Sequence, residues 1–208
     1  MRQIWLVLAA FLLTASLGAA SPAAAAAETA APAPTAQDRV LGKADAPITI
    51  IEYGSLTCPH CAEFNTTTLP DLKKHWIDTG KAKLVFRVFP LNSLDVRAAM
   101  LARCVPPDRY FAFIDTVYHD QASWMGAHDP EEALGSIARL AGVSEDKIKS
   151  CLADKSAQDA VVADAYTAQK SYGVDSTPTF FINGAKMDPN GAQPYDVFDK
   201  QLSAASKS

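Results

Sequence analysis

The stretch Cys58-Pro59-His60-Cys61 lies four residues after the apolar run 48–53 (ITIIEY), and it decides how the chain folds. An apolar run followed by a proline suited to the first helical turn predicts a strand and then a helix. At such a junction the unpaired N–H groups and the positive end of the helix dipole face the first sulfur. This field favours the thiolate, which is the nucleophile in disulfide exchange. The spacing predicts that Cys58 attacks a partner and that Cys61 resolves the mixed disulfide.

His60 can add a positive charge or a hydrogen-bond donor beside the Cys58 sulfur. That would stabilise the thiolate, and a stabilised reduced form makes the disulfide a better oxidant. The alternative is a solvated turn histidine without effect on the sulfur. We expect His60 to act on Cys58.

A Cys-x-x-Cys pair is also half of many zinc sites, which need four ligands, usually in two close pairs. The other two cysteines are far from the motif and from each other, and the histidines outside the motif show no ligand spacing; these residues are Cys104, Cys151, His75, His119 and His128. The sequence therefore favours redox chemistry, and we expect no metal and no organic cofactor.

The first residues are typical of an export signal. An apolar stretch from Ile4 to Leu13 follows Arg2, and residues 23–27 offer the small-x-small pattern of a signal peptidase site. The apolar stretch is shorter than the about 20 residues of a membrane span. We expect a cleaved signal over residues 1–27, a flexible Ala/Pro leader over residues 28–39, and a mature protein in the oxidising periplasm.

Composition is that of an ordinary globular protein, with 49% hydrophobic residues, 20% charged residues and a formal net charge of -4. The part after the leader is long enough for one domain with a sizeable core. A mildly acidic balance argues against a nucleic-acid surface, which needs clustered Lys and Arg.

Two strands and a helix surround the dithiol. We expect a strand over residues 48–54, a helix over residues 59–79 kinked by Pro70, and a second strand over residues 82–89. This order predicts a βαβ unit with parallel strands. The dithiol then lies at the carboxyl end of the first strand, where reaction sites of open α/β sheets are found.

The rest of the chain is helical and then returns to the sheet. Residues 93–173 predict four or five helices, which form an insertion. Residues 177–182 predict a strand, and Asn183-Gly184 is a favoured two-residue hairpin turn. A last helix over residues 194–205 covers the sheet.

This layout resembles the thioredoxin superfamily, and the dithiol with a helical insertion resembles its exported DsbA-type thiol:disulfide oxidoreductases. The resemblance implies an α/β thioredoxin fold with an inserted helical domain. Its parts would be residues 40–90 with the dithiol, the insertion 91–173, and residues 174–208, which complete the fold.

The resemblance implies roles for Thr177 and Pro178. In this family the proline is cis and lies against the active-site disulfide, and the backbone of the preceding residue pairs with the substrate peptide. Pro178 could otherwise be an ordinary proline at the start of a strand. Thr177 departs from the Val that is common in strongly oxidising members, so its hydroxyl is expected to adjust the potential.

Glu52 interrupts the apolar run six residues before Cys58. Alternation places it beneath the active site, where thioredoxin-like proteins hold a buried carboxylate. A buried acid has a raised pKa and can exchange a proton with Cys61. The alternative is a strand-end glutamate that faces solvent. We favour the buried acid because a carboxyl group in a central strand is costly.

Cys104 and Cys151 are left over, and an even cysteine count in an exported protein favours pairing. We expect a structural disulfide, with two buried free thiols or a second redox pair as alternatives. A bridge closing this loop would contribute about 4 kcal/mol.

We therefore expect a monomeric periplasmic oxidase that donates its Cys58–Cys61 disulfide to unfolded exported proteins. The resemblance alone implies reoxidation by a DsbB-like, quinone-linked membrane partner. The first rival is a reductase or isomerase that uses the same dithiol. Such isomerases usually carry a dimerisation segment before the thioredoxin fold. The short leader of this sequence has too few core-forming residues to form one, which counts against this alternative. The second rival is a module that binds a metal or unfolded chains.

Overall fold

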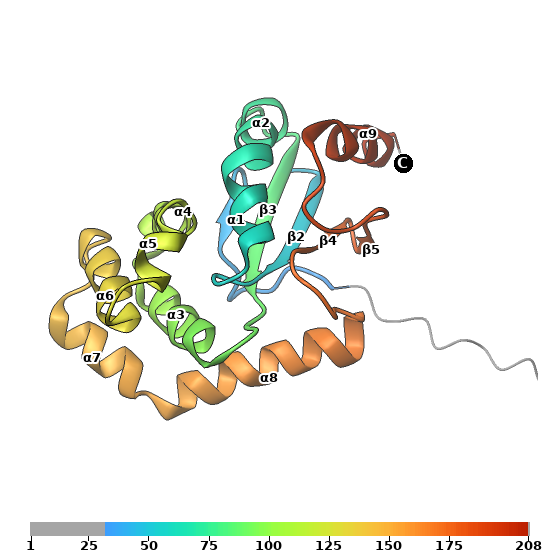
Figure 1. Cartoon of the computed structure of the whole chain (residues 1–208). Coiled ribbons are helices and arrows are strands. Elements are labelled where there is room, and N and C mark those ends of the chain that lie inside the picture. Colours follow the sequence, from blue (N-terminus) through green and yellow to red (C-terminus); the bar gives the residue numbers. More distant parts are fainter. Residues whose placement is uncertain (1–31, 208) are drawn as a thin grey trace, which may run out of the picture.

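A computed structural model describes residues 32–207; the predicted signal at residues 1–27 lies outside them. Five strands form one sheet in the order β1-β3-β2-β4-β5 (Figure 1). The strands are β1 (Val40–Leu41), β2 (Ile48–Gly54), β3 (Ala82–Val88), β4 (Thr179–Ile182) and β5 (Ala185–Lys186). As predicted, β2 and β3 are parallel neighbours. Strand β4 pairs with β2 in the antiparallel direction, which was not predicted from the sequence.

The connection from β2 to β3 is one helical stretch made of four segments. It consists of α1 (Pro59–Glu63), a π-helical segment (Phe64–Thr68), α2 (Leu69–Leu72) and a second π-helical segment (Lys73–Ile77). Pro70 has no N–H with which to continue the α-helical pattern. The chain widens just before it, where Leu69 N–H donates to Phe64 C=O five residues back. The expected kink is thus a π-helical turn.

The insertion contains six α-helices rather than the expected four or five. They are α3 (Ser93–Cys104), α4 (Tyr110–His119), α5 (Gln121–Met125), α6 (Pro130–Leu140), α7 (Glu145–Ala153) and α8 (Lys155–Tyr172). We name this part, residues 93–172, the helical insertion. The extra break is at Asp120, between α4 and α5, where no glycine or proline marks it in the sequence.

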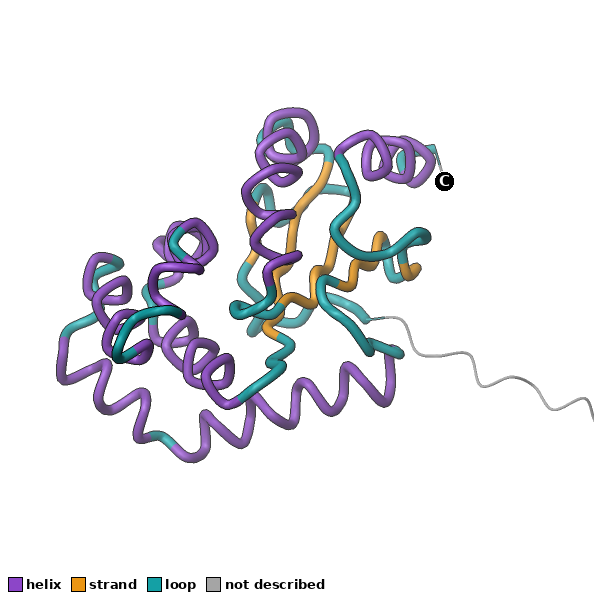
Figure 2. The backbone as a smooth tube through the Cα atoms, viewed as in Figure 1, coloured by secondary structure: helices purple, strands orange, loops and turns teal. Residues whose placement is uncertain are grey.

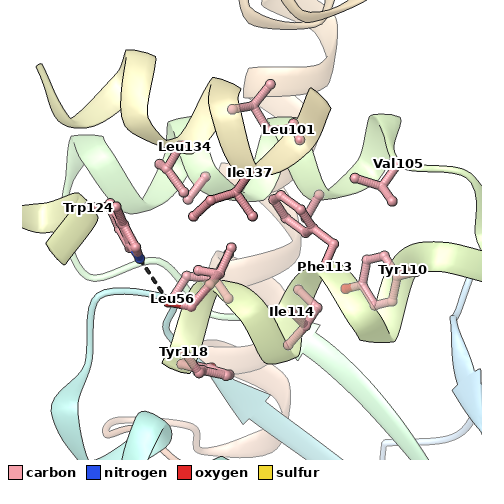
Figure 3. Packing of buried hydrophobic residues seen from close by; sticks show 14 of the residues in the cluster. Leu56, Leu101, Val105, Tyr110, Phe113, Ile114, Tyr118, Trp124, Leu134 and Ile137 are labelled. Carbon is pink, nitrogen blue, oxygen red and sulfur yellow. Dashed lines mark hydrogen bonds between the residues drawn. The ribbon is translucent and has the colours of Figure 1, made fainter. Parts of the chain in front are cut away.

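The helical insertion has a hydrophobic core of its own, shown in Figure 3. Phe113, Trp124 and Leu134 are fully buried there, and Trp124 Nε1–H donates to Val117 C=O at 2.8 Å. Leu56, from the loop before the dithiol, enters the same cluster. The loop that carries the active site is therefore packed into the insertion.

Helices cover both faces of the sheet, as Figures 1 and 2 show. Alternate residues of β2 reach opposite faces. Ile50 packs with Phe64 and Phe198 under α1 and α9 (Tyr195–Ala205), whereas Ile51 packs on the other face with Ala168 of α8. Glu52 lies two residues after Ile50 in β2, so its side chain points to the same face of the sheet. Its carboxyl group therefore lies on the α1 side, beneath the dithiol.

The hairpin turn between β4 and β5 has positive φ at both residues, 49° at Asn183 and 85° at Gly184. These values belong to the predicted two-residue turn.

The end of the predicted flexible leader contacts the sheet. Arg87 of β3 donates to Ala33 C=O and to the Asp38 carboxylate, both at 2.7 Å. A guanidinium group that is largely removed from water needs such partners. The part of the leader at residues 33–38 is therefore attached to β3.

Candidate active site

Cys58 is the residue that caps the N-terminus of α1. Its backbone is extended, with φ −86° and ψ 123°, and Pro59 occupies the first helical position. Cys58 C=O accepts the first helical hydrogen bond, from Ala62 N–H at 3.2 Å. Strand β2 ends at Gly54, so the four residues between strand and helix bring the sulfur to the carboxyl end of the sheet.

The two cysteines lie in different environments although both are free thiols. Cys58 is 6% exposed and Cys61 is completely buried. The hydrogen bond between the two sulfurs is the main cause that lowers the pKa of Cys58, to about 5. Thr177 and the backbone N–H groups of Cys61 and His60 lower it further. The same shared hydrogen bond, together with burial and the Glu52 charge, raises the pKa of Cys61. The lowered pKa favours the thiolate at Cys58, and the raised pKa favours the thiol at Cys61.

The inner sulfur is contacted by the loop before the motif. Ser55 N–H donates to Cys61 Sγ at 3.4 Å, within the range of sulfur hydrogen bonds. This amide therefore faces the thiol that must carry negative charge when the disulfide opens.

Glu52 is buried, with 3% of its surface exposed. Burial raises the pKa of its carboxyl group to about 8, and the Cys58 charge adds to this. Its Oε1 atom has no hydrogen-bond partner in the described structure. A neutral carboxyl group with this pKa can give up or accept a proton near neutral pH.

The Thr177-Pro178 peptide bond is cis. Cys58 Sγ lies 3.5 Å from Thr177 C=O, so this loop is in contact with the exposed edge of the dithiol. The Thr177 hydroxyl is buried without a hydrogen-bond partner, and it lies near enough to Cys58 to help lower the pKa of that thiol.

The His60 ring differs from the expectation. Its side chain is 71% exposed, and Nδ1 faces Glu63 Oε2 at 3.4 Å. The ring points outward because His60 occupies the solvent side of the first turn of α1. The contribution of His60 to the low pKa of Cys58 comes from its backbone N–H.

Three residues of the helical insertion, and Asn92 just before it, form hydrogen bonds with the loop 55–58. None of them was expected from the sequence. Tyr118 Oη donates to Ser55 C=O at 3.2 Å, and Gln121 Nε2 donates to the carbonyls of Leu56 and Cys58 at 2.9 and 3.0 Å. The insertion thus bonds both carbonyls that flank Thr57.

The remaining contacts come from the first turn of α3. Asp95 accepts from Leu56 N–H at 2.9 Å and from Leu91 N–H at 3.0 Å. Asn92 donates to the Thr57 hydroxyl at 3.0 Å and accepts from Asp95 N–H as the helix cap. The cap pattern of Asn92 and Asp95 is visible in the sequence, but the loop that it contacts is not.

Cys104 and Cys151 form a disulfide with Cα atoms 6.5 Å apart. It joins the end of α3 to α7 across the helical insertion.

Two features are absent from the described part of the chain. Residues 32–207 contain no group of three His, Cys, Asp or Glu side chains placed to bind a metal. No helix in the same range has the length and apolar character needed to cross a membrane.

Comparison with known proteins agrees with this geometry. A family model described as thioredoxin matches residues 34–204. A curated Rickettsia bellii protein named protein-disulfide oxidoreductase is 36% identical over 152 residues, which is 73% of this chain and 59% of that protein. Disulfide bond formation protein D of Bacillus cereus is 32% identical over 168 residues, covering 78% of this chain and 77% of that protein. The chain thus spans less than two thirds of the Rickettsia relative.

A solved structure is similar over most of both chains. The crystal structure of Wolbachia pipientis alpha-DsbA1 matches with a TM-score of 0.77 and 33% identity, covering 84% of this chain and 93% of that chain. The chain therefore belongs to the DsbA-type thiol:disulfide oxidoreductases of the thioredoxin superfamily, with a thioredoxin fold and an inserted helical domain.

Proposed function

We propose that this protein is an exported oxidase that introduces disulfide bonds into folding secreted proteins through Cys58 and Cys61. The observation that carries the proposal is the placement of Cys58 as the N-cap of α1, with its sulfur 3.5 Å from Thr177 C=O and with Cys61 completely buried behind it. This setting lowers the pKa of Cys58 to about 5. A favoured thiolate stabilises the reduced enzyme, which makes its disulfide a better oxidant.

The reaction follows from the exposure of the two sulfurs. A substrate thiolate attacks Cys58 Sγ, the Cys58–Cys61 bond breaks, and Cys61 leaves with the electron pair. Glu52 gives its proton to Cys61, since its pKa of about 8 keeps the carboxyl group protonated at neutral pH. A second substrate thiolate then attacks the substrate sulfur of the mixed disulfide and releases Cys58 as a thiolate. The products are an oxidised substrate and a reduced enzyme.

Thr177 and Pro178 form the substrate-binding edge in this proposal. The contact of Cys58 Sγ with Thr177 C=O supports it, because a peptide that reaches the sulfur passes this backbone. Thr177 and the backbone N–H of His60 help to hold the pKa of Cys58 low. The disulfide Cys104–Cys151 has a structural role.

The setting of the reaction is part of the proposal. Residues 1–27 are a cleaved signal and residues 28–39 a leader, and the mature monomer works in the periplasm on unfolded exported proteins. The fold is divided into residues 40–90, 91–173 and 174–208. A DsbB-like, quinone-linked membrane oxidase restores the disulfide, and the chemistry at the dithiol requires no bound cofactor.

Equilibration of the dithiol in glutathione buffers tests the direction of the reaction. We expect a potential clearly above the roughly −270 mV of thioredoxin, and oxidation of a reduced, unfolded substrate in glutathione-free buffer. A potential at or below that of thioredoxin would instead assign a reductase or isomerase.

A further inference from the structure

The helical insertion places a buried hydroxyl group next to the buried acid. Tyr118 of α4 is almost fully buried at the edge of the insertion core (Figure 3), and its Oη atom bonds Ser55 C=O at a long 3.2 Å. Among the described residues Glu52 Oε1 has no hydrogen-bond partner. A buried carboxyl oxygen without a partner is costly, and the cost rises steeply when the group is ionised.

Gly54 locates the two oxygens relative to each other. A methyl group built on its Cα atom would lie 2.9 Å from Glu52 Oε1 and 3.1 Å from Tyr118 Oη. Both oxygens therefore line the same small space beside Gly54 and are no more than about 6 Å apart. Any larger residue at this position would separate them, so the glycine keeps the hydroxyl and the carboxyl group within reach.

The surroundings of Tyr118 keep its hydroxyl group protonated. Burial raises its pKa well above the ordinary value, and four acidic groups add to this: Cys61 on α1, Glu52 on β2, Asp95 on α3 and Tyr110 on α4. The charge that acts on Glu52 is that of Cys58, the N-cap of α1, and Glu52 in turn raises the pKa of Cys61. The Tyr118 hydroxyl is therefore a protonated donor that lies beside the same space as Glu52 Oε1.

We propose that Tyr118 is a positioning residue for Glu52, whose carboxylate it stabilises after Glu52 has given its proton to Cys61. In that step the Glu52 O–H bond breaks, the Cys61 S–H bond forms, and the negative charge of the leaving thiolate moves to Glu52. The Tyr118 hydroxyl then exchanges its weak bond to Ser55 C=O for a bond to the carboxylate beside Gly54. This inference rests on the proposed proton transfer from Glu52.

The substitution Tyr118→Phe removes only the hydroxyl group and keeps the ring that packs edge-on against Phe86. The readout is the protonated carboxyl band of Glu52 in the infrared spectrum of the reduced full-length protein, followed against pH and assigned by its absence in Glu52→Gln. We expect a midpoint of about 8 in the wild type. Without its donor the midpoint rises by about one pH unit, the value of one hydrogen bond to a charged group.

Tyr195→Phe is the matched control, because Tyr195 on α9 also donates one hydrogen bond, to Asp199 at 2.8 Å, far from the dithiol. Its midpoint stays at the wild-type value. If the midpoint is about 8 in the wild type and unchanged in Tyr118→Phe, the role of Tyr118 is overturned, whereas the proton transfer from Glu52 still stands. A wild-type midpoint in the ordinary glutamate range overturns the proton transfer from Glu52 and this inference with it.

A double-mutant cycle gives a second readout that tolerates some loss of stability. The rate at which a substrate thiol reduces the enzyme should fall about tenfold at pH 7 in Tyr118→Phe, because the Glu52 proton is held more tightly. In the Glu52→Gln background the same substitution should have no further effect. Additive effects of the two substitutions would contradict the coupling.

Discussion

Replacing Glu52 by glutamine should make the reduced protein more stable, and by an amount that depends on pH. In the folded protein the carboxyl group has a pKa of about 8, whereas in the unfolded chain it has the ordinary value of 4.5. The folded state therefore binds more protons between these values, and its stability falls as pH rises from 4.5 to 8. The cost is on the order of 1 kcal/mol at pH 5 and 3 kcal/mol at pH 7.

Glutamine has nearly the shape of the protonated acid and no charge to bury. The variant should match the wild type at pH 4.5 and exceed it by about 3 kcal/mol at pH 7. The assay is urea unfolding of both proteins from pH 4.5 to 8. A glutathione buffer keeps Cys58 and Cys61 reduced, and mass spectrometry checks that the Cys104–Cys151 disulfide is intact. With the dithiol oxidised the gain should be smaller, because the Cys58 charge that adds to the burial of Glu52 is then absent.

Glu63→Gln is the matched control, since this side chain is 61% exposed and faces the His60 ring. It should show no gain that grows with pH. The argument about Glu52 is refuted if Glu52→Gln differs from the wild type by a constant amount at every pH, or if it is less stable at pH 7.

Three further predictions concern the surroundings of the dithiol. Replacing Cys104 and Cys151 by serine should lower the stability by about 4 kcal/mol, the chain entropy of a separation of 47 residues, while oxidase turnover of the folded variant is kept. Asp95→Ala leaves the buried N–H of Leu56 and the part-buried N–H of Leu91 without their acceptor, and it should cost about 2 kcal/mol in urea unfolding. A loss below about 1 kcal/mol would mean that water replaces the carboxylate. Gly54→Ala places a methyl group 2.6 Å from the Phe86 ring, and it should destabilise the protein by about 2 kcal/mol. It should also slow the reduction of the enzyme by a substrate thiol. A wild-type rate of reduction would show that the space between Glu52 and Tyr118 beside Gly54 is not needed.

Local patterns predicted the elements around the dithiol well. The alternation of residues 48–54, the proline at the first helical position and the Asn183-Gly184 turn act over a few residues, so the strand, the helix start and the hairpin were found. The two-residue strand β1 was missed, since a pair of residues has no detectable period. Asp120 also gave no signal, and the number of helices in the insertion was underestimated.

The side chains that hold the dithiol loop could not be predicted in the same way. Tyr118, Gln121 and Asp95 bond the loop 55–58 over separations of 39 to 65 residues. In the sequence each looks like an ordinary helical or capping residue. The outward orientation of His60 likewise depends on Glu63, one turn later on the same helix, and on the solvent around them.

By itself the sequence determined the redox motif, its place between strand and helix, and an acid beneath it, because those features depend on neighbours along the chain. Only the tertiary structure decided that this acid is left without a partner, that a tyrosine of the insertion lies beside it, and that the insertion bonds the active-site loop. The physical reason is that burial and pKa depend on every group packed around a carboxyl or thiol group, and those groups come together only when the helical insertion folds against the sheet.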